Sequence, residues 1–268
     1  FLQMGWSYTL DRNIHHRLTI NRTVFIELNH FGRWIFLSTA MMFAATQTDR
    51  ILLGKYLPIA MFGVYSIAAS MAELPKILVS AISSKIIFPL ISMHGDLPRH
   101  ELLLKVLRKR KWLLIALSLL VAVFTGLGDK LISLLYDDRY QQAGWILPLL
   151  SLGMWPLILY VTLDPLLYVV EHPRYPAFGN LFKFIYMLIV LPLAFMAAGQ
   201  IGAVVAVALN DLPAYAVVNY GLKQHNLSGL RQDAGITALL LLALAAIILI
   251  RHLTGAGFPG RAAFISAL

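Results

Sequence analysis

The stretch WLLIALSLLVAVF (112–124) contains no charged residue, and its apolar side chains do not alternate with polar ones. The stretch ALLLLALAAIILI (238–250) has the same character. Strands of a membrane barrel alternate with a period of two, so these runs favour α-helices that cross a bilayer. The whole chain agrees, because 59% of its residues are hydrophobic and only 13% are charged, against about 25% charged in an ordinary soluble domain. We therefore expect an all-α, polytopic membrane protein.

Seven apolar segments are long enough, or nearly so, to cross the membrane. They lie near residues 34–48, 59–82, 112–128, 145–169, 179–198, 201–220 and 236–250. The first and last are short against the ~20 residues that a spanning helix needs, so both should extend further. We divide the chain into a cytoplasmic connector (1–33, with the tail of an earlier helix allowed for), a transmembrane lobe (34–250) and a C-terminal tail (251–268). Because the chain opens at Phe1, we interpret it as a fragment that lacks an N-terminal part.

Lysine and arginine predict the orientation. If the connector is cytoplasmic, the inner segments carry 14 of the 22 Lys and Arg residues and the outer segments carry 6. This bias follows the positive-inside rule and places the C-terminus outside. The stretch LLLKVLRKRK (102–111) contributes most, and it resembles an amphipathic helix on the inner surface near anionic lipid heads. Topology therefore explains the net charge of +9 better than nucleic-acid binding does.

Ionisable residues near the centres of two spans are the main functional signal. A charge at bilayer depth costs about 2.5–3.5 kcal/mol and usually serves a substrate or ion path. Glu73 and Lys76 lie in the second span, and Asp211 lies in the sixth, beside Asn210 and before Pro213. An acid next to a helix breaker at the midplane is typical of transporter sites. The alternative is structural: Glu73 and Lys76 neutralise each other at i,i+3, and Asp211 is a protonated or paired acid between helices.

Serines give the second span one polar face. On a continuous helix with about 100° per residue, five residues fall within about 80° of one another: Ser66, Ser70, Glu73, Ser80 and Ser84. We interpret this face as the wall of a water-lined cavity, with close helix packing through the serines as the alternative.

Other charged residues are predicted to have structural roles. Asp49 and Arg50 lie at the outer end of the first span, where they suit an interfacial pair. Asp164 lies near the inner end of its span, where it can pair with Arg174 or Lys183.

Signals for enzymatic chemistry are weak. The chain has no cysteine, His15-His16 lacks metal-ligand spacing, and no second acidic cluster accompanies Asp137-Asp138. We expect no catalytic residue, no metal site and no cofactor.

Three stretches resemble a known family. The first stretch is residues 31–75, FGRWIFLSTAMMFAATQTDRILLGKYLPIAMFGVYSIAASMAELP. It resembles the C-terminal half of bacterial polysaccharide and O-antigen flippases. These flippases belong to the multidrug/oligosaccharidyl-lipid/polysaccharide exporter superfamily. The matching residues are Gly32, Asp49-Arg50, Leu53-Gly54, Phe62-Gly63, Tyr65 and Ala68. LLYDDRYQQAGWILPLLSLG (134–153) resembles the family's outer loop entering the next helix, although Asp137 stands where glycine is common. AAGQIGAVVAVAL (197–209) resembles its Gly-x-x-Gly-Ala turn between two late helices.

The resemblance implies one lobe of a two-lobe transporter in the bacterial cytoplasmic (inner) membrane. Members flip undecaprenyl-pyrophosphate-linked oligosaccharides during biosynthesis of O-antigen lipopolysaccharide, capsule or exopolysaccharide. The implied partners are the lipid-linked oligosaccharide, the lipid bilayer, H⁺ or Na⁺, and the missing N-terminal lobe. The seventh span departs from the plain lobe of this family. A cation-coupled multidrug antiporter of the same superfamily and a membrane enzyme acting on lipid-linked sugars are the alternatives.

Within such a transporter we expect a cationic cavity. Lys76 would attract the pyrophosphate, Arg50 would lie at the outer mouth, and the serines and Asn210 would bind sugar hydroxyls. The expected substrate-binding residues are Lys76, Arg50, Ser70, Ser80 and Asn210, and the expected ion-coupling residues are Glu73 and Asp211. No covalent step is needed, so the chain is not expected to be an enzyme.

Overall fold

The computed structural model describes residues 22–93, 98–255 and 257, which are helical apart from short connections and contain no strand. The all-α class predicted from the sequence is confirmed. The chain divides into two compact units, residues 1–33 and 34–268. Of the first unit, the structure describes residues 22–33, which form the start of helix α2 (Arg22–Tyr56).

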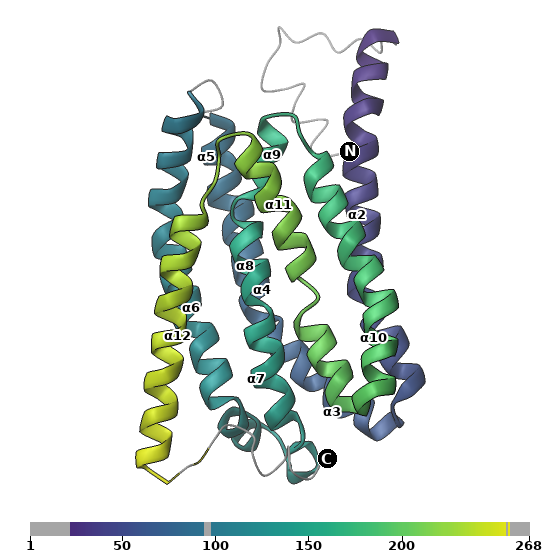
Figure 1. Cartoon of the computed structure of the whole chain (residues 1–268), viewed down its shortest axis with the longest axis vertical. Coiled ribbons are helices and arrows are strands. Elements are labelled where there is room, and N and C mark those ends of the chain that lie inside the picture. Colours follow the sequence, from purple (N-terminus) through teal and green to yellow (C-terminus); the bar gives the residue numbers. More distant parts are fainter. Residues whose placement is uncertain (1–21, 94–97, 256, 258–268) are drawn as a thin grey trace, which may run out of the picture. The chain divides into compact units, whose positions relative to one another are not determined.

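The second unit continues from α2 as a series of helices joined by short connections (Figure 1). They are α3 (Ile59–Ala72), α4 (Leu74–Ile82), the π-helix η1 (Ser83–Ile87), α5 (Phe88–Met93), α6 (Arg99–Leu135), the 3₁₀-helix η2 (Asp138–Tyr140), α7 (Ala143–Gly153), α8 (Trp155–Val161), α9 (Asp164–Val169), α10 (Arg174–Ala208), α11 (Leu212–Gln224) and α12 (Leu230–Leu253).

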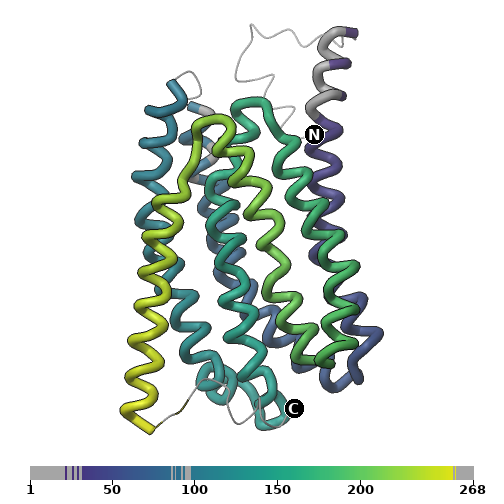
Figure 2. The backbone as a smooth tube through the Cα atoms, viewed as in Figure 1, coloured from purple at the N-terminus to yellow at the C-terminus, as the bar shows by residue number. Residues whose placement is uncertain are grey.

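Five segments of the described residues are long and apolar enough to cross a membrane: Ile59–Ile91, Arg99–Leu135, Ala143–Val169, Arg174–Gln224 and Leu230–Leu253. The fourth contains two antiparallel legs, because the chain reverses at Ala198 and Gly199 inside α10 (Figure 2). Gly199 has φ of 54°, a conformation that other residues rarely adopt. The predicted spans 179–198 and 201–220 therefore correspond to the two legs. The predicted span 34–48 lies within α2, which is not among the five.

Prolines explain why several spans consist of short helices. A proline cannot donate a backbone hydrogen bond inside a helix, but it fits the first turn of a new one. Pro75, Pro156, Pro165 and Pro213 stand in the first turns of α4, α8, α9 and α11. Two of these interruptions fall at predicted site residues: Glu73 joins α3 to α4, and Asp211 precedes α11.

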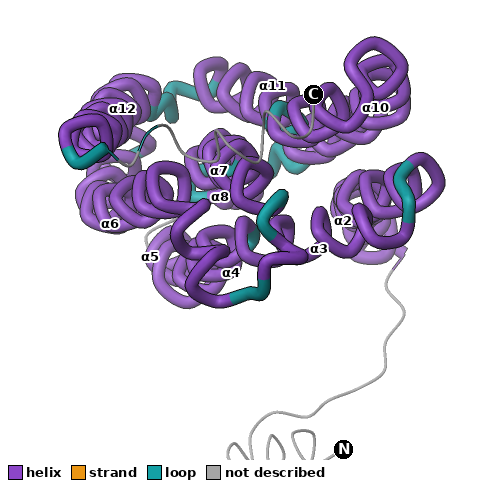
Figure 3. The backbone as a smooth tube through the Cα atoms, turned by 90° about the horizontal axis from the view of Figure 1, so that it is seen from below, coloured by secondary structure: helices purple, strands orange, loops and turns teal. Residues whose placement is uncertain are grey.

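Helices α7 and α8 lie at the centre of the second unit, with α3, α4, α6, α10 and α11 around them (Figure 3). Their segment, Ala143–Val169, is 67% buried over its most apolar window, against 17–39% for the other four. Gly153 permits a close approach of α7 to the end of α10, because a Cβ at this position would collide with the backbone of Ala208. The central position of α7 and α8 lets them form one wall of the site described below.

The basic stretch 102–111 is not a separate surface helix. It is the first part of α6, which has 37 residues and is about 55 Å long, longer than the ~30 Å hydrocarbon core. Lys105, Arg108 and Lys109 are exposed, but Arg110 is completely buried. The stretch is amphipathic as predicted, because Leu102, Leu103 and Val106 are buried. The correction is that it extends the membrane helix and that one of its cations points inward.

The connections alternate between the two ends of the second unit, as the predicted topology requires. Residues 57–58, 136–142 and the reversal at Gly199 lie at one end. The start of α6 and the connections 170–173 and 225–229 lie at the other (Figure 1). Which end faces the cytoplasm stays a prediction from the charge bias.

Candidate functional site

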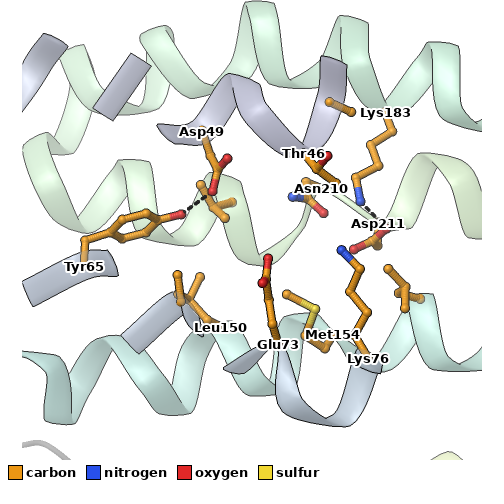
Figure 4. Close-up of a pocket in the computed structure, with 14 residues that line it drawn as sticks. Thr46, Asp49, Tyr65, Glu73, Lys76, Leu150, Met154, Lys183, Asn210 and Asp211 are labelled. Atoms are coloured by element: carbon orange, nitrogen blue, oxygen red, sulfur yellow. Dashed lines mark hydrogen bonds and ion pairs between the residues drawn. The ribbon is translucent and has the colours of Figure 1, made fainter. Parts of the chain in front are cut away.

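A pocket of about 440 Å³, counted with its open mouth, lies among α2, α3–α4, α7–α8 and α10–α11 (Figure 4). We call it the central pocket. Its polar lining residues are Thr46, Asp49, Tyr65, Glu73, Lys76, Lys183, Asn210 and Asp211. Apolar side chains such as Leu150, Met154 and Leu157 come from the central helices. Ionisable groups from separate membrane segments thus converge on one space.

The shortest ion pair in the central pocket joins α10 to the break before α11. Lys183 Nζ lies 2.6 Å from Asp211 Oδ1, and their side chains are 5% and 2% exposed. The Tyr160 hydroxyl lies 3.2 Å from the same carboxylate oxygen and donates a hydrogen bond to it. Because both charges are buried, each depends on the other for compensation.

A second carboxylate is held by a tyrosine. The Tyr65 hydroxyl of α3 donates a 2.7 Å hydrogen bond to Asp49 Oδ2 of α2. The other oxygen, Asp49 Oδ1, is buried and has no hydrogen-bond partner among the described residues. Since a buried carboxylate oxygen without a donor is costly, this atom is well suited to bind a proton, a cation or a ligand hydroxyl.

Glu73 and Lys76 do not form the pair that the structural alternative offered. Glu73 Oε2 lies 3.8 Å from Arg50 Nη2, in a loose ion pair whose side chains are 34% and 47% exposed. Lys76 extends into the central pocket toward Asp211 from the opposite wall (Figure 4). Within the described ranges Lys76 makes no ion pair within 4 Å, so its charge is available to a ligand.

The structure brings four of the seven predicted site residues into the central pocket: Glu73, Lys76, Asn210 and Asp211. Arg50 lies at its edge through the contact with Glu73. Ser70 and Ser80 are exposed and do not line the pocket. The predicted serine face assumed one continuous helix, whereas the chain is interrupted at Glu73 and becomes π-helical at Ser83, which changes the angle between successive residues.

The lining carries charges of both signs, which corrects the expectation of a cationic cavity. Asp49, Glu73 and Asp211 supply three carboxylates, and Lys76 and Lys183 supply two ammonium groups. No group of three or more His, Asp or Glu side chains suited to a metal ion is found among the described residues.

Several members of the site were not predicted. Asp49 was assigned to an interfacial pair with Arg50, yet it binds Tyr65. Lys183 was counted with the inner loops and offered as a partner for Asp164, yet it binds Asp211. The available signal was that Lys183 falls inside the predicted span 179–198, where a cation needs a partner. Within the described ranges Asp164 has no ion pair, so its predicted pairing is also wrong.

Comparison with known proteins gives one family. A family model described as "Polysaccharide biosynthesis protein" matches residues 2–154, which is more than half of the chain. The matched region includes α2 to α7 and therefore Asp49, Glu73 and Lys76. No match was found among curated proteins or among solved structures.

Proposed function

We propose that this chain, which belongs to the polysaccharide biosynthesis protein family, forms part of a transporter that flips a lipid-linked oligosaccharide across the bacterial cytoplasmic membrane. The observation that carries the proposal is the central pocket, where ionisable side chains from several membrane segments meet. A sugar head attached through a diphosphate cannot cross hydrocarbon unaided, because its polar groups would lose their hydrogen bonds. A polar interior lowers this cost without any covalent step.

Lys76 is the proposed diphosphate-binding residue. It lines the central pocket and has no ionic partner within the described ranges. An ammonium group on a flexible stem suits a phosphate that moves during transport, because it acts as a point charge with rotatable donors. Asn210 and Thr46 line the same space and offer hydrogen bonds to sugar hydroxyls. Arg50 extends the positive charge toward the mouth.

The mixed charge of the lining supports coupling to H⁺ or Na⁺. While Asp211 is ionised, it neutralises Lys183 at 2.6 Å. A proton or Na⁺ on Asp211 would release the Lys183 ammonium group, which could then bind the diphosphate together with Lys76. Glu73 and Arg50 offer the same exchange in a more exposed position. Ion binding would in this way change the affinity of the pocket for an anionic substrate, which is what coupled transport needs.

Three carboxylates in one pocket also favour a second candidate, an antiporter of organic cations. Such a substrate would bind Asp49, Glu73 or Asp211 directly. Lys76 separates the two candidates, since its charge attracts a diphosphate and repels a cation. Replacing Lys76 by Gln should weaken handling of a lipid-linked oligosaccharide but preserve or strengthen that of a cationic drug.

The direct test is leaflet-resolved flipping of the lipid-linked oligosaccharide in vesicles that contain the full-length protein. We expect K76Q to slow flipping at limiting substrate and K76R to restore part of it. The matched control is K85Q, which removes the same charge from an exposed residue outside the central pocket. If K76Q flips substrate like wild type, or if K85Q is equally impaired, the central pocket is not the substrate site.

A further inference from the structure

A pair of stacked histidines lies away from the central pocket. His172, between α9 and α10, and His225, between α11 and α12, have ring centroids 4.0 Å apart and ring planes inclined by 22°. The Tyr175 ring meets both edge-on, at 6.5 Å from His172 and 5.7 Å from His225. The Tyr175 ring is itself tightly seated, because a Cβ at Gly221 would collide with it. The two connections are thus held together by aromatic contacts.

The surroundings of this pair are strongly positive. Burial lowers the pKa of both imidazoles, and the charges of Arg99 and Arg174 lower each pKa further. Each imidazole faces the other, and Glu171 is the acid whose charge opposes the shift at His172. Arg174 also lies over the Tyr175 ring, 5.1 Å from its centroid. We call Arg99, His172, Arg174 and His225 the histidine cluster. Among the described residues neither arginine of the cluster makes an ion pair.

Backbone and side-chain donors in the histidine cluster are also incompletely used. Arg99 and Arg174 are the first residues of α6 and α10, and neither helix has a side-chain cap at this end. Glu101 is the acid in the first turn of α6, and the first turn of α10 contains none. A helix N-terminus carries partial positive charge, so an arginine there is unfavourable unless an anion is near. The Nε2 atom of His225 is buried and has no hydrogen-bond partner among the described residues. An oxyanion bound here would accept hydrogen bonds from the two arginines and from His225 Nε2, and it would offset the positive charge of the two helix N-termini.

We propose that the histidine cluster binds a phosphate group, carried either by an anionic lipid or by a diphosphate-bearing molecule. Phosphate oxygens accept charge-assisted hydrogen bonds from guanidinium and imidazolium groups and suit helix N-termini. This site is separate from the central pocket, so it does not depend on the proposed transport function. On the predicted topology it faces the cytoplasm.

Phosphate binding at the histidine cluster is linked to proton uptake. Without an anion the imidazoles are neutral at pH 7, because their pKa values lie below the ordinary 6.5. A bound phosphate favours the protonated imidazole and raises its pKa. Affinity therefore rises as the pH falls through this raised value, so binding should be tighter at pH 6 than at pH 8.

The test is equilibrium binding of radiolabelled pyrophosphate to the full-length protein in phosphatidylcholine nanodiscs at pH 6 and pH 8. R99Q and R174Q should each weaken binding about tenfold, the size expected for one charge-assisted contact. H172Q combined with H225Q should remove the pH dependence. The matched control is R108Q, an exposed arginine of α6 outside the cluster. All variants are compared in the K76Q background, because Lys76 is the diphosphate contact proposed for the central pocket. Adding R108Q should leave the binding of K76Q unchanged.

Nanodiscs that contain phosphatidylglycerol identify the source of the phosphate. Competition by this lipid assigns the histidine cluster to lipid headgroups, and lack of competition assigns it to a diphosphate. Absence of pyrophosphate binding to wild type in phosphatidylcholine overturns the proposal. Absence of pyrophosphate binding to K76Q, unchanged binding when R99Q or R174Q is added to K76Q, or an equal loss when R108Q is added, also overturns it.

Discussion

Two buried ion pairs of almost equal length have different surroundings. Arg110 Nη2 lies 2.7 Å from Asp233 Oδ1, and Lys183 Nζ lies 2.6 Å from Asp211 Oδ1. Arg110 also donates hydrogen bonds to Thr162, to Gln232 and to the carbonyl of Leu159. The Lys183–Asp211 pair instead forms part of a pocket wall, opposite another lysine.

The Arg110–Asp233 pair has a structural role, and we call it a brace, whereas the Lys183–Asp211 pair is placed to change its partners. The Arg110–Asp233 pair connects α6, α8 and α12, and the Tyr215 hydroxyl of α11 donates a 3.1 Å hydrogen bond to Asp233. Four helices therefore depend on one guanidinium and one carboxylate, and no ligand can reach either. Lys183 and Asp211 border open space, so a proton or ligand can change their pairing. The same chemistry has a structural role where it is enclosed and is suited to function where it borders a cavity.

The largest effect should come from breaking the enclosed pair. R110M leaves Asp233 buried without its partner, which costs about 3–5 kcal/mol in proteins. We expect a large loss in the thermal unfolding temperature of the purified protein in detergent. R108M, at an exposed position of the same helix, is the control and should unfold like wild type. Equal unfolding temperatures for R110M and R108M would contradict the role of Arg110 as a brace.

Breaking the Lys183–Asp211 pair should reduce the stability less than breaking the Arg110–Asp233 pair, but it should remove the dependence of transport on ions. D211N removes the charge partner of the buried Lys183, but the amide oxygen of the asparagine can still accept a hydrogen bond from the ammonium group, so we expect about 1–3 kcal/mol. Substrate binding should survive, while the dependence of flipping on pH or Na⁺ should disappear. Thermal unfolding and leaflet-resolved flipping measure the two effects on the same preparation. Retained ion dependence in D211N would remove Asp211 from the coupling mechanism.

A smaller effect should follow from the hydrogen bond between Tyr65 and Asp49. Y65F removes the 2.7 Å hydrogen bond to Asp49 Oδ2, while Asp49 Oδ1 already has no hydrogen-bond partner among the described residues. The expected loss is about 1 kcal/mol in unfolding. Y186F, which changes a tyrosine outside the central pocket, serves as the comparison in the same unfolding experiment. Identical stability in Y65F and wild type would show that another donor satisfies Asp49.

The smallest effect should come from the exposed pair at the edge of the pocket. Arg50 and Glu73 are 3.8 Å apart, with side chains 47% and 34% exposed. Exposed pairs of this kind contribute at most about 1 kcal/mol, so R50Q should unfold within about 1 kcal/mol of wild type. Salt should weaken the pair further. A loss in R50Q as large as that in R110M would show that exposure does not separate the two classes of pair.

The sequence predicted the fold class and much of the site for the same reason. Long apolar runs form helices in a membrane, because the backbone must satisfy its own hydrogen bonds there. An ionisable residue inside such a run is energetically costly and is therefore usually functional. This argument identified Glu73, Lys76, Asn210 and Asp211, which line the central pocket. It failed for Arg110 and Lys183, because cations near the ends of spans look like ordinary interfacial residues. It also failed for Ser70 and Ser80, because the helix that would align them is interrupted.

The sequence by itself determined that this chain crosses a membrane as helices, and its prolines and glycines placed most of the interruptions. These are local properties, since hydropathy and backbone freedom act over a few neighbouring residues. Only the tertiary structure decided which charges meet. Lys183 and Asp211 are 28 residues apart, and Tyr160 lies 51 residues from the same carboxylate. Such contacts depend on how the helices pack around α7 and α8, and that packing depends on the whole set of side chains.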